Sequence, residues 1–483
     1  MVNAIHADFQ VKVTSRLGSA LREAIVTMLA VLATFICTMA IAPEPGPGVL
    51  AVVLSLSFAR SHLDRDLRGR LEAAVALPLV GLTAVGAGML LHRAPWIGAA
   101  AFVLGMFVSI WLRRFGPMAG RMGSLIALPF VAILTTPYIP PHHLSPAMIL
   151  AAPVIVGLLA LAWVATLQAA ARRIGLLPQL RKQPVVTPEP PPPETARGPR
   201  ASTRMAIQMA AALSIAFVVG YLFFPQRWAW IVLTAFIVNS GNRGRLDVAY
   251  KSVLRVLGAA AGTVIALTVT VHIGAHDSFT VACMLAAVFL GLWLRPMAYA
   301  WWALFVTIAL ALLQGFNGTN GDSLLWTRLE EILIGALIGV LCAWLVYPVR
   351  STGVLRRRIA NALAALSDAL SAAPSERQTT TFIATLDQVE QVAPPFRASR
   401  RALRRLRPNH PADWIDTLLA CRIPALALIE GGEAPGHVRK ALGAARKALR
   451  EPENLLPALQ QLRQTLVTPA AASGDAAATS EET

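Results

Sequence analysis

Long apolar runs separated by short polar stretches fill the chain up to residue 347. The runs cover 22–42, 48–59, 71–91, 95–112, 121–138, 147–170, 205–224, 228–239, 252–273, 278–294, 299–316 and 328–347. A helix that crosses a membrane needs about 20 predominantly apolar residues, and most of these runs approach or reach that length. The pattern therefore predicts an all-α integral membrane protein with twelve transmembrane helices.

The second and eighth segments, "VLAVVLSLSF" and "WAWIVLTAFIV", are shorter than the others. If both only dipped into the membrane, each half would have five spans, and the basic loops from Arg60 to Arg121 would lie outside. The charge pattern favours twelve spans, with these two helices short, polar-ended or broken. Short segments at matching positions of two halves point to a transport site.

The two sets of six segments repeat one another. The matching pairs are Asp66 with Asp247, Arg70 with Lys251, Gly81 with Gly262, Trp111 with Trp293 and Trp163 with Trp344, each 181 or 182 residues apart. Because one spacing holds along the whole half, the matches predict an internal duplication.

Basic residues gather after every second apolar run. They are Arg60, Arg65, Arg68 and Arg70, then Arg113, Arg114 and Arg121, then Arg172, Arg173, Arg181 and Lys182, then Arg243, Arg245 and Lys251, then Arg295, and finally Arg350 and Arg356–Arg358. The alternate loops contain few cations, with Arg93 and Arg227 as exceptions. Cytoplasmic loops carry the excess of Lys and Arg, so both termini are expected in the cytoplasm. An even number of spans in each half makes the two six-helix repeats parallel.

The composition agrees with a membrane protein, because 55% of the residues are hydrophobic and 14% are charged, against roughly 25% charged residues in soluble domains. The basic loops explain most of the net charge of +17, so no nucleic-acid partner is expected. The four cysteines have neither metal-ligand nor redox spacing. We expect no metal and no cofactor.

The predicted domains follow the changes in composition. They are a cytoplasmic N-terminus (1–21), a first transmembrane repeat (22–172), a Pro-rich cytoplasmic linker (173–203), a second transmembrane repeat (204–349), a helical cytoplasmic region (350–467) and a disordered tail (468–483). The basic stretch "RASRRALRRLRP" (397–408) in the helical region fits a solvated helix face beside an anionic membrane better than a site for lipid or nucleic acid.

The stretch "SGNRGRLDVAYKSVLRVLGAAAGTVIALTVTV" (240–271) begins charged and ends apolar. On a helix, Asp247, Lys251 and Arg255 lie on one stripe. One interpretation is an ion pair and an anchor at the cytoplasmic end of the ninth helix. The other is that Arg255, followed by the small residues of "VLGAAAG", faces a partner or an anion path because it cannot easily reach the lipid headgroups.

A second charged group, "WTRLEEILIGALIG", opens the twelfth segment at what the topology predicts to be the opposite membrane face. Arg328 and Glu331 share one helix face. Either they neutralise each other at the interface, or Glu331 takes up and releases a proton. Trp228 and Trp230, on the short eighth segment, are interpreted as interfacial residues or as a stacking surface for an aromatic substrate.

The stretches "FPQRWAWIVLTAFIV", "RVLGAAAG" and "RLEEILIG" resemble the fusaric acid resistance (FUSC) family, which includes bacterial aromatic carboxylic acid exporters. The chain is also similar to the plant aluminium-activated malate transporters, which are anion channels. Within 204–350, where the match is best, Arg255 and Gly258 occupy the family's RxxGT signature, and Ala259 replaces its Thr. The resemblance implies export of organic anions across the bacterial inner membrane, in some relatives with a periplasmic adaptor protein.

These observations predict an inner-membrane exporter of organic acids, in particular aromatic carboxylic acids, that is driven by the proton gradient. The expected site residues are Arg255, Lys251, Arg70, Arg68, Arg328, Trp228 and Trp230 for the substrate, and Glu331 for the proton. A passive organic-anion channel and a membrane scaffold with partner-binding cytoplasmic helices are the alternatives. No phosphate loop, HExxH motif or nucleophile with a base at diagnostic spacing is present, so we expect no enzyme. The oligomeric state is left open.

Overall fold

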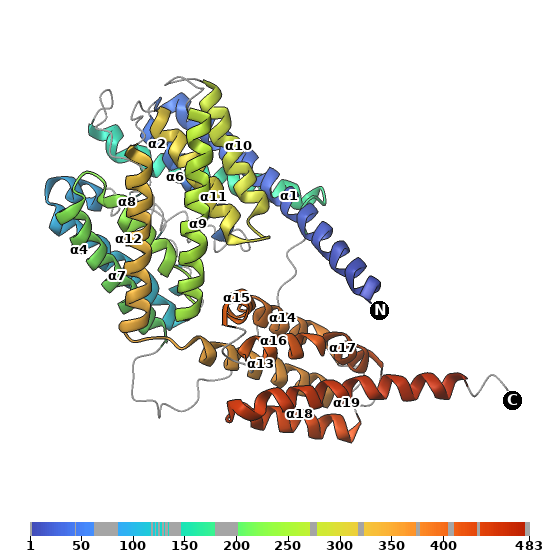
Figure 1. Cartoon of the computed structure of the whole chain (residues 1–483). Coiled ribbons are helices and arrows are strands. Elements are labelled where there is room, and N and C mark those ends of the chain that lie inside the picture. The colour runs from blue at the N-terminus through green and yellow to red at the C-terminus, as the bar shows by residue number, and fades with distance from the viewer. Residues whose placement is uncertain are drawn as a thin grey trace. The chain divides into compact units, whose positions relative to one another are not determined.

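A computed structural model of the chain is shown in Figure 1. It describes residues 2–43, 45–61, 86–116, 119–120, 122–123, 126–127, 130, 134, 146–178, 201–270, 278–316, 323–372, 377–403, 410–431 and 435–478. Every regular element in these ranges is a helix. The described residues form two compact units, a membrane unit up to residue 348 and a C-terminal unit from residue 349, and residues 243–250 group with the C-terminal unit.

The membrane unit contains α1 (Val2–Ile41), α2 (Pro45–Ser61), α4 (Pro95–Trp111), η2 (Leu112–Phe115), α6 (Pro146–Arg173), α7 (Ala201–Phe223), α8 (Trp228–Asn239), most of α9 (Arg245–Thr270), α10 (Ser278–Leu294), α11 (Tyr299–Phe316) and α12 (Ser323–Leu345). The C-terminal unit contains α13 (Ser351–Ser371), α14 (Thr379–Glu390), α15 (Ala393–Leu403), α16 (Pro411–Ala420), α17 (Arg422–Gly431), α18 (Gly436–Ala448) and α19 (Pro452–Ala478).

Within the membrane unit, the helices of the two halves make corresponding contacts. The helices α1, α2 and α6 pack on one another, and so do α7, α8 and α12. Figure 1 shows α4, α7, α8 and α12 in one group, because α4 of the first half packs against α7 of the second. In turn, α10 of the second half packs against α1, where the indole Nε1 of Trp293 donates a hydrogen bond to Leu17 O at 3.3 Å.

Five helices of the described part are long and apolar enough to cross a membrane. These spans are Leu17–Ile41, Pro95–Phe115, Ala151–Arg173, Ala201–Phe223 and Arg245–Thr268. Shorter apolar helices accompany them, and α8 has 12 residues, which at about 1.5 Å per residue extend about 18 Å. The hydrocarbon core is roughly 30 Å thick. The chain is therefore an all-α, multi-pass membrane protein. The count of twelve spans stays a prediction, because much of the predicted third and fifth segments lies outside the described residues.

Two helices cover terminal segments of the chain. The predicted cytoplasmic N-terminus, 1–21, is part of α1, which runs without a break from Val2, in keeping with the absence of Pro and with Gly18 as the only Gly in this segment. The tail 468–483 was expected to lack regular structure, yet α19 continues to Ala478. Alanine has the highest helix propensity, and the end of α19 is rich in it. Of the predicted Pro-rich linker, residues 179–200 lie outside the described part.

The C-terminal unit has its own apolar core. Leu363 of α13, Phe382 of α14, Ile415 of α16 and Leu459 of α19 are fully buried in one cluster. Their helices are amphipathic, so each contributes one apolar stripe to this core and leaves its polar face in solvent.

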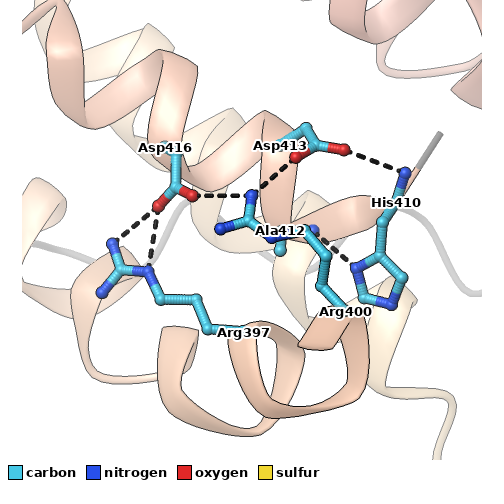
Figure 2. Close-up of polar contacts among 6 residues, drawn as sticks. All are labelled: Arg397, Arg400, His410, Ala412, Asp413 and Asp416. Carbon is cyan, nitrogen blue, oxygen red and sulfur yellow. Dashed lines mark hydrogen bonds and ion pairs between the residues drawn. The ribbon is translucent and has the colours of Figure 1, made fainter. Parts of the chain in front are cut away.

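Ion pairs hold α15 against α16 in this unit (Figure 2). Arg400 Nη1 lies 2.6 Å from Asp413 Oδ1 and 2.8 Å from Asp416 Oδ2, while Arg397 Nη2 lies 2.8 Å from Asp416 Oδ1. The hydrogen bond to Asp413 is the main cause that raises the pKa of Arg400 above its usual value. Two arginines of the basic stretch 397–408 therefore make structural contacts within the unit.

The start of α9 and the turn before it group with the C-terminal unit. The backbone N–H of Leu246 donates to Ser351 Oγ at 2.9 Å. Gly244 has φ of +117°, and a Cβ at this position would lie 2.6 Å from Ser351 Oγ. The left-handed backbone and the close approach both require glycine here.

Candidate functional site

The start of α8 and the charged turn of α12 lie next to each other because two glycines of α12 permit close packing. A Cβ on Gly335 would lie 2.6 Å from Ile231 O, and one on Gly339 would lie 2.8 Å from Asn239 Nδ2. Small residues at a helix interface let two backbones approach closely in a membrane. The sequence spacing alone did not indicate that these two helices are neighbours.

Arg328 and Glu331 of α12 are both buried, with 4% and 1% of their surface exposed. The guanidinium carbon of Arg328 lies 4.3 Å from the centre of the Trp230 ring on α8. A cation over an aromatic face is attracted by the negative potential of the ring. Trp230 thus contacts a charged side chain of the protein itself. This contact is a third interpretation, beside the interfacial residue and the stacking surface for a substrate that the sequence suggested.

Arg227, which the sequence analysis treated as an exception in a loop, belongs to this group. It precedes α8 directly, and its Nη1 lies 3.9 Å from Glu331 Oε1. The same nitrogen donates a hydrogen bond to Thr327 Oγ1. Thr327 and Glu331 are one turn apart on α12, so both face the start of α8. Nothing in the sequence indicated that Arg227 contacts α12.

Arg255 lies in α9, with 2% of its surface exposed. One turn further on, α9 packs tightly on α11, since a Cβ on Gly258 would lie 2.8 Å from Ala300 O and one on Gly262 would lie 2.6 Å from Leu304 O. Within the described part of the chain, the Nε of Arg255 has no hydrogen-bond partner. A buried guanidinium with an unsatisfied N–H is costly in an apolar environment.

The two buried arginines act on each other. Arg328 is repelled by Arg255 and attracted by Glu331, while Arg255 interacts with the hydroxyl group of Tyr299 on α11. The sequence analysis assigned Arg255 and Arg328 to opposite membrane faces. The repulsion between Arg255 and Arg328 makes the surroundings of the two guanidinium groups electropositive, and their assignment to opposite membrane faces stays a prediction.

Lys251, one turn before Arg255 in α9, extends its side chain to the C-terminal end of α8. Its Nζ is 3.4 Å from Ser240 O and 3.3 Å from Gly241 O. An ammonium group in this position satisfies carbonyls at a helix C-terminus and interacts favourably with the helix dipole. Asp247, which the sequence placed on the same stripe, accepts a hydrogen bond from Arg243 N at 3.1 Å.

Trp228 packs among aromatic side chains. Its ring centroid lies 5.4 Å from that of Phe217 and 5.3 Å from that of Tyr221. Tyr221 in turn contacts Trp96 of α4 at 5.2 Å. Such edge-to-face and tilted pairs stabilise packing. Trp228 therefore joins α8 to α7, in a cluster that continues to α4, and its predicted role in substrate stacking stays a prediction.

Arg68 and Arg70, the predicted site residues of the first half, lie outside the described residues. In the sequence register of the duplication, Glu331 corresponds to Leu150 and Arg255 to Ala74. The predicted first repeat therefore has neither group at the matching position. Among the residues that the structure describes, no group of three or more His, Cys, Asp or Glu side chains is arranged to hold a metal ion.

Residues 212–342, which contain α8, α9, α10, α11, most of α12 and about half of α7, match the family model for fusaric acid resistance protein-like domains. The chain is similar to the uncharacterized protein YhfK of Escherichia coli, at 25% identity over 176 residues. This match covers 36% of the chain and 24% of the relative, so the chain matches about a quarter of that protein's length. No solved structure matches the chain. The similarity to aluminium-activated malate transporters stays a prediction.

Proposed function

We propose that the chain exports organic acids across the inner membrane, and the match of residues 212–342 to the family model for fusaric acid resistance protein-like domains supports this proposal. The substrates are hydrophobic carboxylates, in particular aromatic carboxylic acids. Export runs from the cytoplasm outward and is driven by the proton gradient.

The buried guanidinium of Arg255 carries this proposal. With 2% of its surface exposed and an Nε that lacks a hydrogen-bond partner among the described residues, it needs an anion to compensate the cost of burial. A carboxylate offers two oxygen atoms to the planar guanidinium, in the geometry that arginine binds best. An organic acid that passes through the region would supply this missing contact.

The neighbouring groups support a substrate that is both acidic and apolar. Repulsion between Arg255 and Arg328 is relieved when an anion lies between or beside them. The region is otherwise lined by helices whose apolar residues are buried, such as Ile231 and Val232 of α8 and Ile332 of α12. Glu331 is the buried carboxylate that attracts Arg328, and it serves in the proposal as the group that takes up the proton.

We also propose that the membrane region consists of two parallel six-helix repeats. The contact of α4 with α7 and that of α10 with α1 are equivalent under the duplication, because α4 corresponds to α10 and α1 to α7. A rotation about the membrane normal relates such halves, and both termini then lie in the cytoplasm. Because Ala74 and Leu150 replace Arg255 and Glu331 in the first half, each chain holds one site of this kind.

Uptake of labelled benzoate into inside-out membrane vesicles tests the function. Gradient-driven uptake that requires the intact chain is the expected result. Uptake at the same rate after the proton gradient is collapsed would instead indicate the passive organic-anion channel. Absence of uptake with benzoate and with larger aromatic acids would contradict the proposal.

Cysteines introduced one at a time into the linker 184–199 test the topology. They should react with a membrane-impermeant thiol reagent in inside-out vesicles and stay unmodified in intact cells. Labelling from the outside of intact cells would contradict parallel repeats with cytoplasmic termini.

A further inference from the structure

Arg227 connects a buried carboxylate to a more exposed part of the membrane unit. Its side chain is 37% exposed, whereas that of Glu331 is 1% exposed. The 3.9 Å between Arg227 Nη1 and Glu331 Oε1 exceeds a hydrogen-bond distance. Glu331 Oε1 also accepts no hydrogen bond within the described residues. The attraction is therefore one of charge, without a closed hydrogen bond to hold it.

The other charged side chains that act on Glu331 have different contacts from Arg227. Arg328 is also attracted to it, and Glu330 repels it, but Arg328 lies over the Trp230 ring. Glu330 is exposed. On the α8 side, Arg227 is the charged group that acts on Glu331, and its further contact is the hydrogen bond to Thr327. Arg227 is thus the cation that can leave Glu331 without breaking the contact between Arg328 and Trp230, although its own hydrogen bond to Thr327 must then break.

We propose that Arg227 is the positioning residue of Glu331, which it keeps ionised and aligned until a proton arrives. A proton from water then binds to a carboxylate oxygen of Glu331, no other bond breaks, and the attraction for Arg227 is lost. Arg227 turns towards the solvent, and the start of α8 is released from the charged turn of α12. Loss of the proton restores the contact. This inference rests on the proposed function, because it describes how proton uptake is linked to the same site.

Infrared difference spectroscopy of the purified full-length protein measures the protonation of Glu331 directly. The carboxylic acid C=O band of Glu331 is the one that Glu331→Gln removes. Because an opposite charge within 4–6 Å favours the ionised form of a carboxyl group, Arg227→Ala should let the protonated form persist to higher pH. We expect the midpoint of the band to move upward by about one pH unit or more.

Two further variants separate this role from a structural one. Arg227→Lys retains the positive charge and should return most of the shift. Thr327→Val removes the hydroxyl that Arg227 contacts but leaves both charges, so the midpoint should stay near that of the wild type. An unchanged midpoint in correctly folded Arg227→Ala protein would overturn the inference, as would an equal shift in Thr327→Val.

Transport is then measured with the same variants in proteoliposomes. The pH at which gradient-driven benzoate transport is half-maximal should move with the infrared midpoint in Arg227→Ala. If the infrared midpoint moves and the wild type transports no aromatic acid, the exporter proposal fails while the link between Arg227 and Glu331 stands. If transport occurs and its pH profile is the same in both proteins, the positioning role fails while the exporter proposal stands.

Discussion

The guanidinium carbon of Arg328 lies 4.3 Å from the centre of the Trp230 ring, so an arginine of α12 rests on an aromatic face of α8. Both residues belong to the segment that matches the family model. The contact orients the buried guanidinium of Arg328, and stacking of an aromatic substrate on the Trp230 ring stays a prediction.

Trp230→Leu should weaken substrate binding. A contact between two aromatic rings contributes about 0.5–1.5 kcal/mol beyond area burial, so the loss of the ring should raise the KM for benzoate roughly twofold to tenfold. Trp230→Phe should recover part of the affinity. The control is Trp326→Leu, since Trp326 lies two residues before Arg328 and is 78% exposed. Transport kinetics in vesicles should give KM values that rise from the wild type to Trp230→Phe to Trp230→Leu. Equal KM values for Trp230→Leu and the wild type would contradict this prediction.

The sequence indicated candidate site residues where a charged residue lies within an apolar segment. A cation at position 255 and a charged pair at 328 and 331 stand out within apolar runs, and the structure buries all three. The sequence missed Arg227 because a single cation before a helix looks like an ordinary loop residue. Its importance follows from a contact with α12, 104 positions further along the chain, which no periodicity reveals.

The arrangement of helices was also beyond the sequence pattern. The periodicity of the sequence shows which face of a helix is apolar. It does not show which other helix packs against that face, because this depends on the shapes of the two surfaces. The glycines at 258 and 262 bring α9 onto α11, and those at 335 and 339 bring α12 onto α8. These close approaches fix the partners of α9 and α12, the helices that carry Arg255 and Arg328, whose charges repel each other.

Gly244→Ala should destabilise the protein more than Gly241→Ala does. Both glycines have positive φ, at +117° and +60°, so each substitution introduces backbone strain of about 1–3 kcal/mol. Only at Gly244 does the new Cβ also meet protein atoms, 2.6 Å from Ser351 Oγ and 2.9 Å from its Cα, whereas the space at Gly241 is open. Thermal unfolding in detergent measures the difference. Ser351→Ala should not rescue Gly244→Ala, because the contact with the backbone remains.

Arg400→Ala should lower the stability of the C-terminal unit, since Arg400 pairs with both Asp413 and Asp416 (Figure 2). Each partly exposed pair contributes about 1 kcal/mol or less, so we expect a loss of about 1–2 kcal/mol that shrinks in 1 M salt. Arg401→Ala is the matched control, because Arg401 lies next in α15, is exposed and has no ion pair among the described residues. Similar unfolding midpoints for both variants would contradict the structural role of the network.

Cys421 should react slowly with thiol reagents while the C-terminal unit is folded. Its side chain is fully buried, and burial raises the pKa of the thiol to about 12. Only about 0.01% of the thiol is then ionised at pH 8, and the thiolate is the reactive form. The protonated thiol is favoured in the folded state, so its contribution to stability is present below about pH 9 and is lost as the pH rises towards 12. Labelling with iodoacetamide, with and without urea, checks this. Rapid modification of Cys421 in native protein would contradict its burial.

Substitutions of Arg255 separate a site residue from a structural one. If Arg255 binds the substrate carboxylate, Arg255→Ala should lower kcat/KM for benzoate at least tenfold, which corresponds to about 1.4 kcal/mol. Arg255→Lys should recover only part, because an ammonium group cannot form the paired hydrogen bonds of a guanidinium.

The most informative substitution at this position is Arg255→Met, which keeps the volume of the side chain but removes its charge. Replacing a buried charge by an apolar group of similar size is often neutral or stabilising, so this variant should unfold at the same temperature as the wild type or higher, and yet transport poorly. Asp247→Ala is the control on the same helix. It removes the hydrogen bond that Asp247 accepts from Arg243 N at 3.1 Å and should reduce the amount of folded protein while transport per molecule is retained. If Arg255→Met instead transports at the wild-type rate, Arg255 is not part of the substrate site, and the buried charge serves only the packing of α9.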